Sequence, residues 1–180
     1  MAFADVAGER IAIESEYRER TLLKSLPGAR WNVEQRVWEL PLTWAACLGL
    51  RGVFGQSLEI GPELARWAQR ELDTRVGPCR TLREMIDVPL REDHDPRWFP
   101  YQRVAVDFLR FAGSSLLASE PGTGKTAVIC GALRVWLPQG SGRRALVVCP
   151  ASARVNWQRE LAMWAPELQT VVVDGSKKKR

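Results

Sequence analysis

The stretch that decides the fold is SSLLASEPGTGKTAVICGAL, residues Ser114 to Leu133. A short apolar run, typical of a buried strand, leads into a glycine-rich turn, and a run with helical spacing follows. The centre, GTGKT at 122–126, matches the end of the phosphate-binding pattern G-x-x-x-x-G-K-[ST]. Ser119 stands where that pattern has its first glycine. The stretch predicts a strand, a loop and a helix that form a nucleotide site.

The chemistry expected of this loop follows from charge and space. Phosphate oxygens need several inward-pointing N–H groups, and glycine permits the tight backbone path that this requires. The helix after the loop directs the positive end of its dipole at the same point. Lys125 is expected to contact the β- and γ-phosphates, and the Thr126 hydroxyl to coordinate Mg²⁺. The alternative is a glycine-rich turn without a ligand, but the apolar strand and helix on either side favour the nucleotide site.

The segments around the loop alternate between strand and helix patterns. Short apolar runs predict buried strands at 115–118, 145–149 and 170–173. Helical spacing of apolar residues predicts helices at 101–111, 126–137 and 156–164. Alternating strands and helices with continuously apolar strands predict an α/β fold, in which helices cover a partial parallel sheet.

The first 75 residues show a different pattern, which occurs twice. Alternation predicts strands, and helical spacing predicts helices, in the order ββαββα of a small α+β domain. The strands are expected at 3–7, 10–13, 30–33 and 36–40, and the helices at 15–26 and 44–50. A further helix is predicted at 61–72, and prolines and charges predict a connector over 76–97. The domains are therefore expected to span 1–75 and 98–180.

Three motifs occur in order around the loop: PYQ at 100–102, EPGTGKT at 120–126 and PASARVNWQRE at 150–160. Together they resemble the SNF2-like branch of the superfamily 2 helicases. That branch carries a P-Y-Q helix, a D-E-x-G-x-G-K-T loop and a V-x-P-x-S-x-x-x-N-W-x-x-E segment. It keeps no glycine at the position of Ser119, whereas Thr123 departs from its usual bulky apolar residue. The resemblance implies a RecA-like lobe with ATP and Mg²⁺ as cofactors and DNA as partner.

The resemblance also implies roles for single residues. Gln102 is expected to read the adenine edge, because an amide offers both a donor and an acceptor, and Phe99 or Tyr101 to pack near the base. Ser152 and Arg154 are expected to contact the DNA backbone. Two plainer interpretations stay open: Gln102 caps its helix, and Ser152 is an N-cap. The nucleotide-binding residues expected are Gln102, Glu120, Gly122, Thr123, Gly124, Lys125 and Thr126, with Lys125 and Thr126 as the catalytic ones.

The first domain resembles the HARP domain of annealing helicases through LPGARW at 26–31 and R-x-W-x-x-P at 36–41. This implies binding to fork, branched or single-stranded DNA. Trp31 and Trp38 are either stacking platforms or core residues, and strand alternation favours the core. If the tryptophans face inward, Arg30 points outward, so Arg30 and Arg36 are the expected DNA contacts.

The overall composition is compatible with these expectations. The net charge of +5 suits a polyanionic partner. The four cysteines form no C-x-x-C pair and the chain has one histidine, so neither a disulfide framework nor a metal centre is expected. No apolar run approaches the roughly 20 residues of a membrane span. A cytoplasmic, nucleoid-associated protein of a bacterial or phage type is expected.

Two elements of a complete motor are missing from the sequence: an acidic D-E-x-[HD] box and arginine fingers from a second lobe. The chain is therefore expected to bind ATP without hydrolysing it alone, and to need a continuing C-terminal motor segment or a second polypeptide. The alternative function is a DNA-binding or regulatory module with a vestigial nucleotide site. PGTGKT also suits AAA+ ATPases, but the PYQ helix and Asn156-Trp157 argue against that family.

Overall fold

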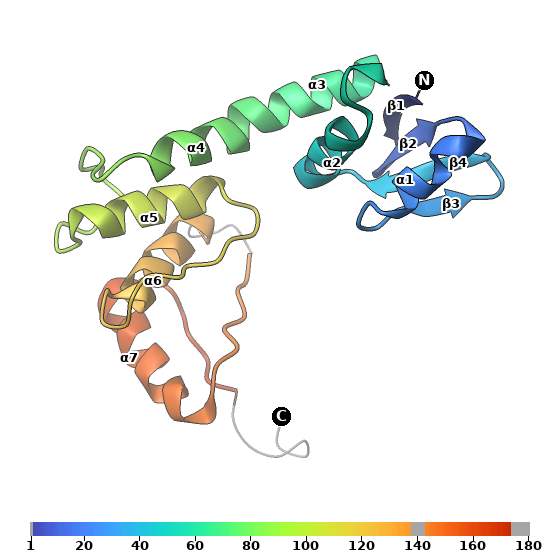
Figure 1. Ribbon diagram of the computed structural model, residues 1–180. Helices are drawn as coiled ribbons and strands as arrows, with labels where there is room; N and C mark the ends of the chain where they lie inside the picture. The colour runs from blue at the N-terminus through green and yellow to red at the C-terminus, as the bar shows by residue number, and fades with distance from the viewer. Residues whose placement is uncertain (1, 138–142, 174–180) are drawn as a thin grey trace. The chain divides into compact units, whose positions relative to one another are not determined.

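The computed structural model describes residues 2–137 and 143–173. The chain divides into two compact units, Met1–Thr74 and Arg75–Arg180 (Figure 1). Each unit buries its own apolar side chains. The five-stranded mixed sheet belongs to the first unit, and the nucleotide-loop motif belongs to the second.

The first unit is built on a sheet with the strand order β3-β4-β2-β1-β5. The strands are β1 (Ala2–Ala7), β2 (Arg10–Glu14), β3 (Arg30–Asn32), β4 (Val37–Pro41) and β5 (Leu58–Ile60). Neighbouring strands are antiparallel except β1 and β5, which pair in parallel. Side chains at alternate positions, such as Ile11 and Ile13, are fully buried because successive residues of a strand face opposite sides. The strand β5 was not predicted.

Three helices complete the first unit: α1 (Arg20–Lys24), α2 (Trp44–Phe54) and α3 (Pro62–Glu71). Thr43 caps α2, since its hydroxyl accepts the N–H of Ala46 at 3.2 Å. Asp5 of β1 caps α3 in the same way and accepts the N–H of Leu64 at 2.7 Å. Short 3₁₀ turns occupy Tyr17–Glu19 and Gly55–Ser57, and a π-helical turn occupies Leu72–Val76.

The second unit contains four helices among its described residues: α4 (Gly77–Arg83), α5 (Pro100–Phe111), α6 (Lys125–Trp136) and α7 (Arg154–Trp164). They pack in chain order, each against the next (Figure 1). Gly131 of α6 lies against the buried ring of Trp98, where a Cβ would stand 2.5 Å from two ring carbons. Cys130 is fully buried, and burial raises the pKa of its thiol to about 11.

The prediction of a parallel sheet in the second unit is wrong for the structure described. Segments 115–118, 145–149 and 170–173 form neither helix nor strand, and they pair with no strand among the described residues. A parallel strand of this kind needs hydrogen-bonded neighbours and cover on both faces. Here Leu116, Val148 and Val171 expose 87–88% of their surface. The apolar composition of these segments is typical of buried strands, but composition alone does not provide the neighbouring strands with which they would have to pair.

No helix of the described ranges is both long and apolar enough to cross a membrane.

Candidate nucleotide site

The loop before α6 follows the path that its glycines permit. Gly122 and Gly124 have φ of +84° and +76°, the left-handed region that other residues rarely adopt. Gly124 is the N-cap of α6 and offers no side chain to its first turn. The first N–H groups of a helix have no partner within the helix, and their partial positive charge favours an anion. The start of α6 therefore has the form of a phosphate-binding site.

Lys125 is the first residue of α6, and its ammonium group points back along the loop. Its Nζ donates to the carbonyl oxygens of Ser119 and Glu120, both at 2.8 Å. The positive charge of Lys125 thus lies beside the same turn as the uncapped N–H groups. Thr126, the next residue, is half-buried at the start of the helix.

Gln102 of α5 is hydrogen-bonded to the loop. Its Oε1 accepts the N–H of Phe99 at 2.9 Å, which caps α5, and its Nε2 donates to the carbonyl of Thr123 at 3.1 Å. The side chain is buried, and a Cβ on Gly124 would stand 2.4 Å from Nε2. The capping role that the sequence left open is therefore present, and Gln102 also positions the loop.

An aromatic pair lies beside the loop. The rings of Phe99 and Tyr101 are stacked with centroids 5.8 Å apart and planes within 5°. Both remain exposed, by 62% and 48%. The Tyr101 hydroxyl donates to the carbonyl of Thr123 at 3.1 Å, the same oxygen that accepts from Gln102. The pair therefore offers an apolar surface that is fixed directly to the loop.

The two residues expected at the DNA backbone belong to the turn before α7. Ser152 lies exposed in a 3₁₀ turn, Ala151–Ala153, and caps neither that turn nor α7. Arg154 begins α7, and its Nε donates to the carbonyl of Ala151 at 3.2 Å. The N-cap interpretation of Ser152 is therefore wrong.

The two arginines expected at DNA belong to the first unit, and they differ in their surroundings. Arg30 is bound to Glu39 at 2.7 Å, which also pairs with Arg10 at 3.0 Å. The hydrogen bond from Asn32, followed by the bond from Arg30, lowers the pKa of Glu39. Arg36 is exposed in the turn between β3 and β4, with φ of +56°.

The two tryptophans of the same hairpin lie opposite each other. Trp38 is buried, whereas Trp31 is 47% exposed and packs edge-on against it, with ring centroids 5.6 Å apart. The prediction of core tryptophans is therefore right for Trp38 and wrong for Trp31. Because β3 is an edge strand of the sheet, Trp31 has a neighbouring strand on one side only.

His94 is a residue whose surroundings the sequence did not reveal. It stands in the charged run REDHDP at 91–96, yet its ring is buried and its Nε2 lies 3.0 Å from Oδ1 of Asp107 on α5. The ring nitrogen Nδ1 accepts the N–H of Arg91 at 3.4 Å, so the proton lies on Nε2 and is donated to Asp107. The pair ties the segment before α5 to the helix that carries Gln102. Neighbouring charges in the sequence gave no signal of this burial.

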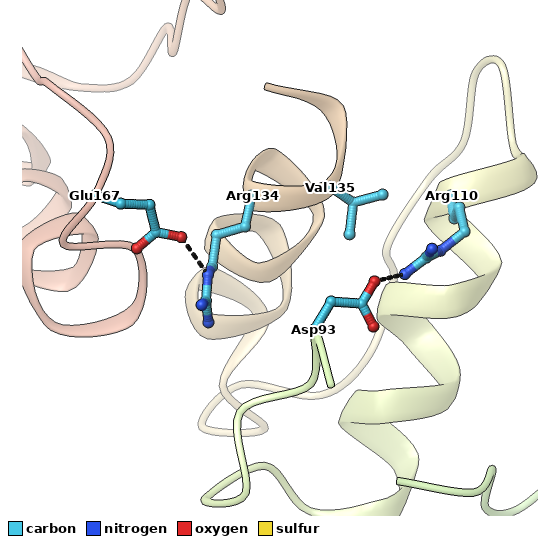
Figure 2. Close-up of a pocket in the computed structure, with 5 residues that line it drawn as sticks. All are labelled: Asp93, Arg110, Arg134, Val135 and Glu167. Carbon is cyan, nitrogen blue, oxygen red and sulfur yellow. Dashed lines mark hydrogen bonds and ion pairs between the residues drawn. The ribbon is translucent and has the colours of Figure 1, made fainter. Parts of the chain in front are cut away.

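A cavity of about 360 Å³ lies between α5, α6 and the segment after α7 (Figure 2). Figure 2 shows two ion pairs on its walls, Asp93 with Arg110 and Arg134 with Glu167. Burial raises the pKa of Asp93, but the bond and charge of Arg110 outweigh this effect and lower it overall. Each cation of the wall has a carboxylate partner, so the cavity does not favour phosphate as the α6 start does. At a rise of 1.5 Å per residue, Arg110 lies about 12 Å along α5 from Gln102, and Arg134 lies about 14 Å along α6 from Lys125.

Comparison with known protein families gives a match that covers most of the chain. The model of the SNF2-related domain matches residues 44–180. The match begins within the first unit, at the start of α2, and covers the whole of the second.

Several curated proteins are similar to this chain over part of its length. The CHD3-type chromatin-remodeling factor PICKLE of Arabidopsis thaliana is 37% identical over 97 residues, 49% of this chain and 7% of that protein. Protein CHROMATIN REMODELING 19 of the same plant is 36% identical over 115 residues, 59% of this chain and 15% of that protein. The ATP-dependent helicase fft2 of Schizosaccharomyces pombe is 38% identical over 84 residues, 44% of this chain and 6% of that protein. No solved structure shows a significant match.

Proposed function

Because the chain belongs to the SNF2-related domain family, we propose that it is the ATP-binding portion of a DNA-dependent ATPase or helicase-like motor. The observation that carries the proposal is the start of α6, where a glycine-shaped loop, uncapped helix N–H groups and Lys125 converge. The curated relatives are much longer than the stretch that matches, since the aligned part covers 6–15% of PICKLE, CHROMATIN REMODELING 19 and fft2. The activity of a whole motor is therefore part of the proposal.

The residues present suit a nucleoside triphosphate with Mg²⁺. Uncapped N–H groups and the Lys125 ammonium supply donors and positive charge for phosphate oxygens. The stacked pair of Phe99 and Tyr101 offers an apolar surface for a base. Thr126 would supply a hydroxyl to Mg²⁺, whose chemistry is to neutralise phosphate charge. The two hydrogen bonds of Gln102 use one N–H of Nε2 and one lone pair of Oε1. Gln102 would therefore contact adenine only through its second N–H and its second lone pair.

Hydrolysis needs further groups that the sequence of this chain does not contain, an acidic box and arginine fingers. We therefore assign them to a continuing C-terminal motor segment or to a second polypeptide. The exposed apolar side chains of segments 115–118, 145–149 and 170–173 support this assignment. Covering such side chains with another layer of structure is favourable, because it removes apolar surface from water.

The proposal predicts that this chain binds ATP and does not turn it over alone. Phosphate release should be measured at steady state with saturating ATP, Mg²⁺ and forked DNA, and compared with a complete two-lobe motor. The expected rate equals that of the Lys125→Ala variant. A rate comparable to the complete motor, abolished by Lys125→Ala, would contradict the proposal.

The proposed DNA contacts are Arg30 and Arg36 of the first unit and Ser152 and Arg154 before α7. Support is strongest for Arg36, which is exposed in the turn of the hairpin that also carries the half-exposed Trp31. Arg30 has weaker support, because its guanidinium group already forms an ion pair with Glu39. The HARP-like interpretation of the first domain rests on the motifs at 26–31 and 36–41, and its proposed preference for branched or single-stranded DNA would depend on Arg30 and Arg36.

Arg36→Ala is expected to weaken binding to forked DNA and to reduce the salt slope of log K by about 1, because one phosphate contact is lost. Fluorescence anisotropy at several salt concentrations measures both. Arg66→Ala is the matched control, because Arg66 is an exposed arginine of the same unit that pairs with Glu63 on α3. Equal slopes for Arg36→Ala and the unchanged chain would remove Arg36 from the interface. DNA binding without ATP binding would favour the alternative, a DNA-binding module with a vestigial nucleotide site.

A further inference from the structure

Two residues that depart from the patterns of the loop lie in contact with each other. Ser119 replaces the first glycine of the general phosphate-loop pattern, and Thr123 replaces a bulky apolar residue of the family pattern. The Thr123 Oγ1 lies 3.0 Å from the Ser119 Oγ and 2.8 Å from the carbonyl oxygen of Glu120. The two unusual residues are therefore joined across the base of the loop.

The direction of these bonds follows from counting protons. A hydroxyl has one proton to donate, and a carbonyl oxygen can only accept. The Thr123 proton therefore goes to the Glu120 carbonyl, and the Ser119 hydroxyl donates to Thr123 Oγ1. Each hydroxyl then has a defined role. The Ser119 hydroxyl loses its acceptor if Thr123 is replaced by an apolar residue, whereas the Thr123 bond to the Glu120 carbonyl survives replacement of Ser119.

The contact lies next to the groups that the nucleotide site needs. The carbonyl oxygens of Ser119 and Glu120 are the two acceptors of Lys125 Nζ. The carbonyl of Thr123 accepts from Tyr101 and Gln102, so α5 fixes the other side of the same residue. Thr123 thereby connects the aromatic pair, the start of the loop and the acceptors of Lys125.

We infer that Ser119 and Thr123 are positioning residues of the nucleotide site, and that their hydroxyl bond closes the loop in the form that accepts a triphosphate. The inference rests on the proposed function. It assigns to Ser119 a role in the site that neither loop pattern gives it.

The test is a double-mutant cycle on the full chain, read as the Kd for ATP with Mg²⁺. The variants are Ser119→Ala, Thr123→Val and the two combined, with Thr123→Ser as the variant that keeps the hydroxyl. Ser119→Ala is expected to raise Kd about threefold, because one neutral hydrogen bond is lost. Thr123→Val should raise it more, since it also removes the bond to Glu120.

The coupling between the two residues decides the inference. Ser119→Ala is expected to change Kd no further in the Thr123→Val background, while Thr123→Ser binds as the unchanged chain does. Melting temperatures should stay equal across the set. Equal effects of Ser119→Ala in both backgrounds, or a Thr123→Ser variant as weak as Thr123→Val, would overturn the inference. Failure of the proposed function is distinct, because then the unchanged chain and Lys125→Ala show the same affinity.

Discussion

At the scale of single residues, Gly124 meets two requirements that favour glycine. Its φ of +76° is strained for any side chain, and the space where a Cβ would go is filled by Gln102 Nε2 at 2.4 Å. Gly122 has the first requirement without the second, since nothing lies within 4 Å of its Cβ position. Comparison of substitutions at the two glycines therefore distinguishes the effect of backbone strain from that of a steric clash at the Cβ position.

The expected result is that Gly124→Ala weakens ATP binding more than Gly122→Ala. Gly122→Ala bears only the cost of the left-handed backbone, roughly 1–2 kcal/mol, whereas Gly124→Ala also displaces Gln102 from Thr123. Titration with ATP and thermal melting of both variants provide the comparison. Equal effects on affinity would show that the contact with Gln102 does not matter.

The sequence identified the loop residues because the glycines and Lys125 act through local backbone geometry, which a short motif records. It did not identify the bond between Ser119 and Thr123, or the second bond of Gln102, because these depend on how the loop folds back and how α5 lies against it. Burial of His94 likewise depends on Asp107, which is thirteen positions further along the chain. Contacts of this kind leave no periodic signal.

At the scale of elements, the helices around the loop were predicted well, whereas α4 lies within the predicted connector at 76–97 and one set of strands was not found. The spacing of apolar residues within α5, α6 and α7 is a local property, and these helices lie within two residues of their predicted ends. The runs at 115–118, 145–149 and 170–173 have strand composition, but a sheet requires neighbouring strands, and none pairs with them in the described ranges. The strand β5 was missed because its three residues are too short for alternation to show.

The space around two helical glycines, Gly131 in α6 and Gly52 in α2, predicts opposite effects of alanine substitution on stability. Gly131→Ala should destabilise the second unit by about 1–3 kcal/mol, because its Cβ would meet the buried Trp98 ring at 2.5 Å. Gly52→Ala in α2 is the matched control, with nothing within 4 Å, and should stabilise the first unit by about 0.5–1 kcal/mol. Denaturant unfolding followed by tryptophan fluorescence measures both. A neutral Gly131→Ala would show that Trp98 can move away at little cost.

At the scale of the whole molecule, the chain joins a five-stranded unit to a helical unit that carries the phosphate loop. Membership of the SNF2-related family covers residues 44–180 and so includes part of the first unit. The second unit leaves apolar side chains exposed on the segments at 115–118, 145–149 and 170–173. Its own residues nevertheless bring together Lys125, the uncapped helix start and an aromatic pair.

The most direct test of the central claim is a calorimetric titration of the full chain with ATP in the presence of Mg²⁺. Saturable binding at one site is predicted, weakened at least about tenfold by Lys125→Ala because a charged donor to phosphate is lost. Lys24→Ala, which removes a lysine from α1 of the first unit, should bind as the unchanged chain does. Absence of binding by the unchanged chain, or equal affinity of the Lys125→Ala variant, would contradict the assignment of this loop as the nucleotide site.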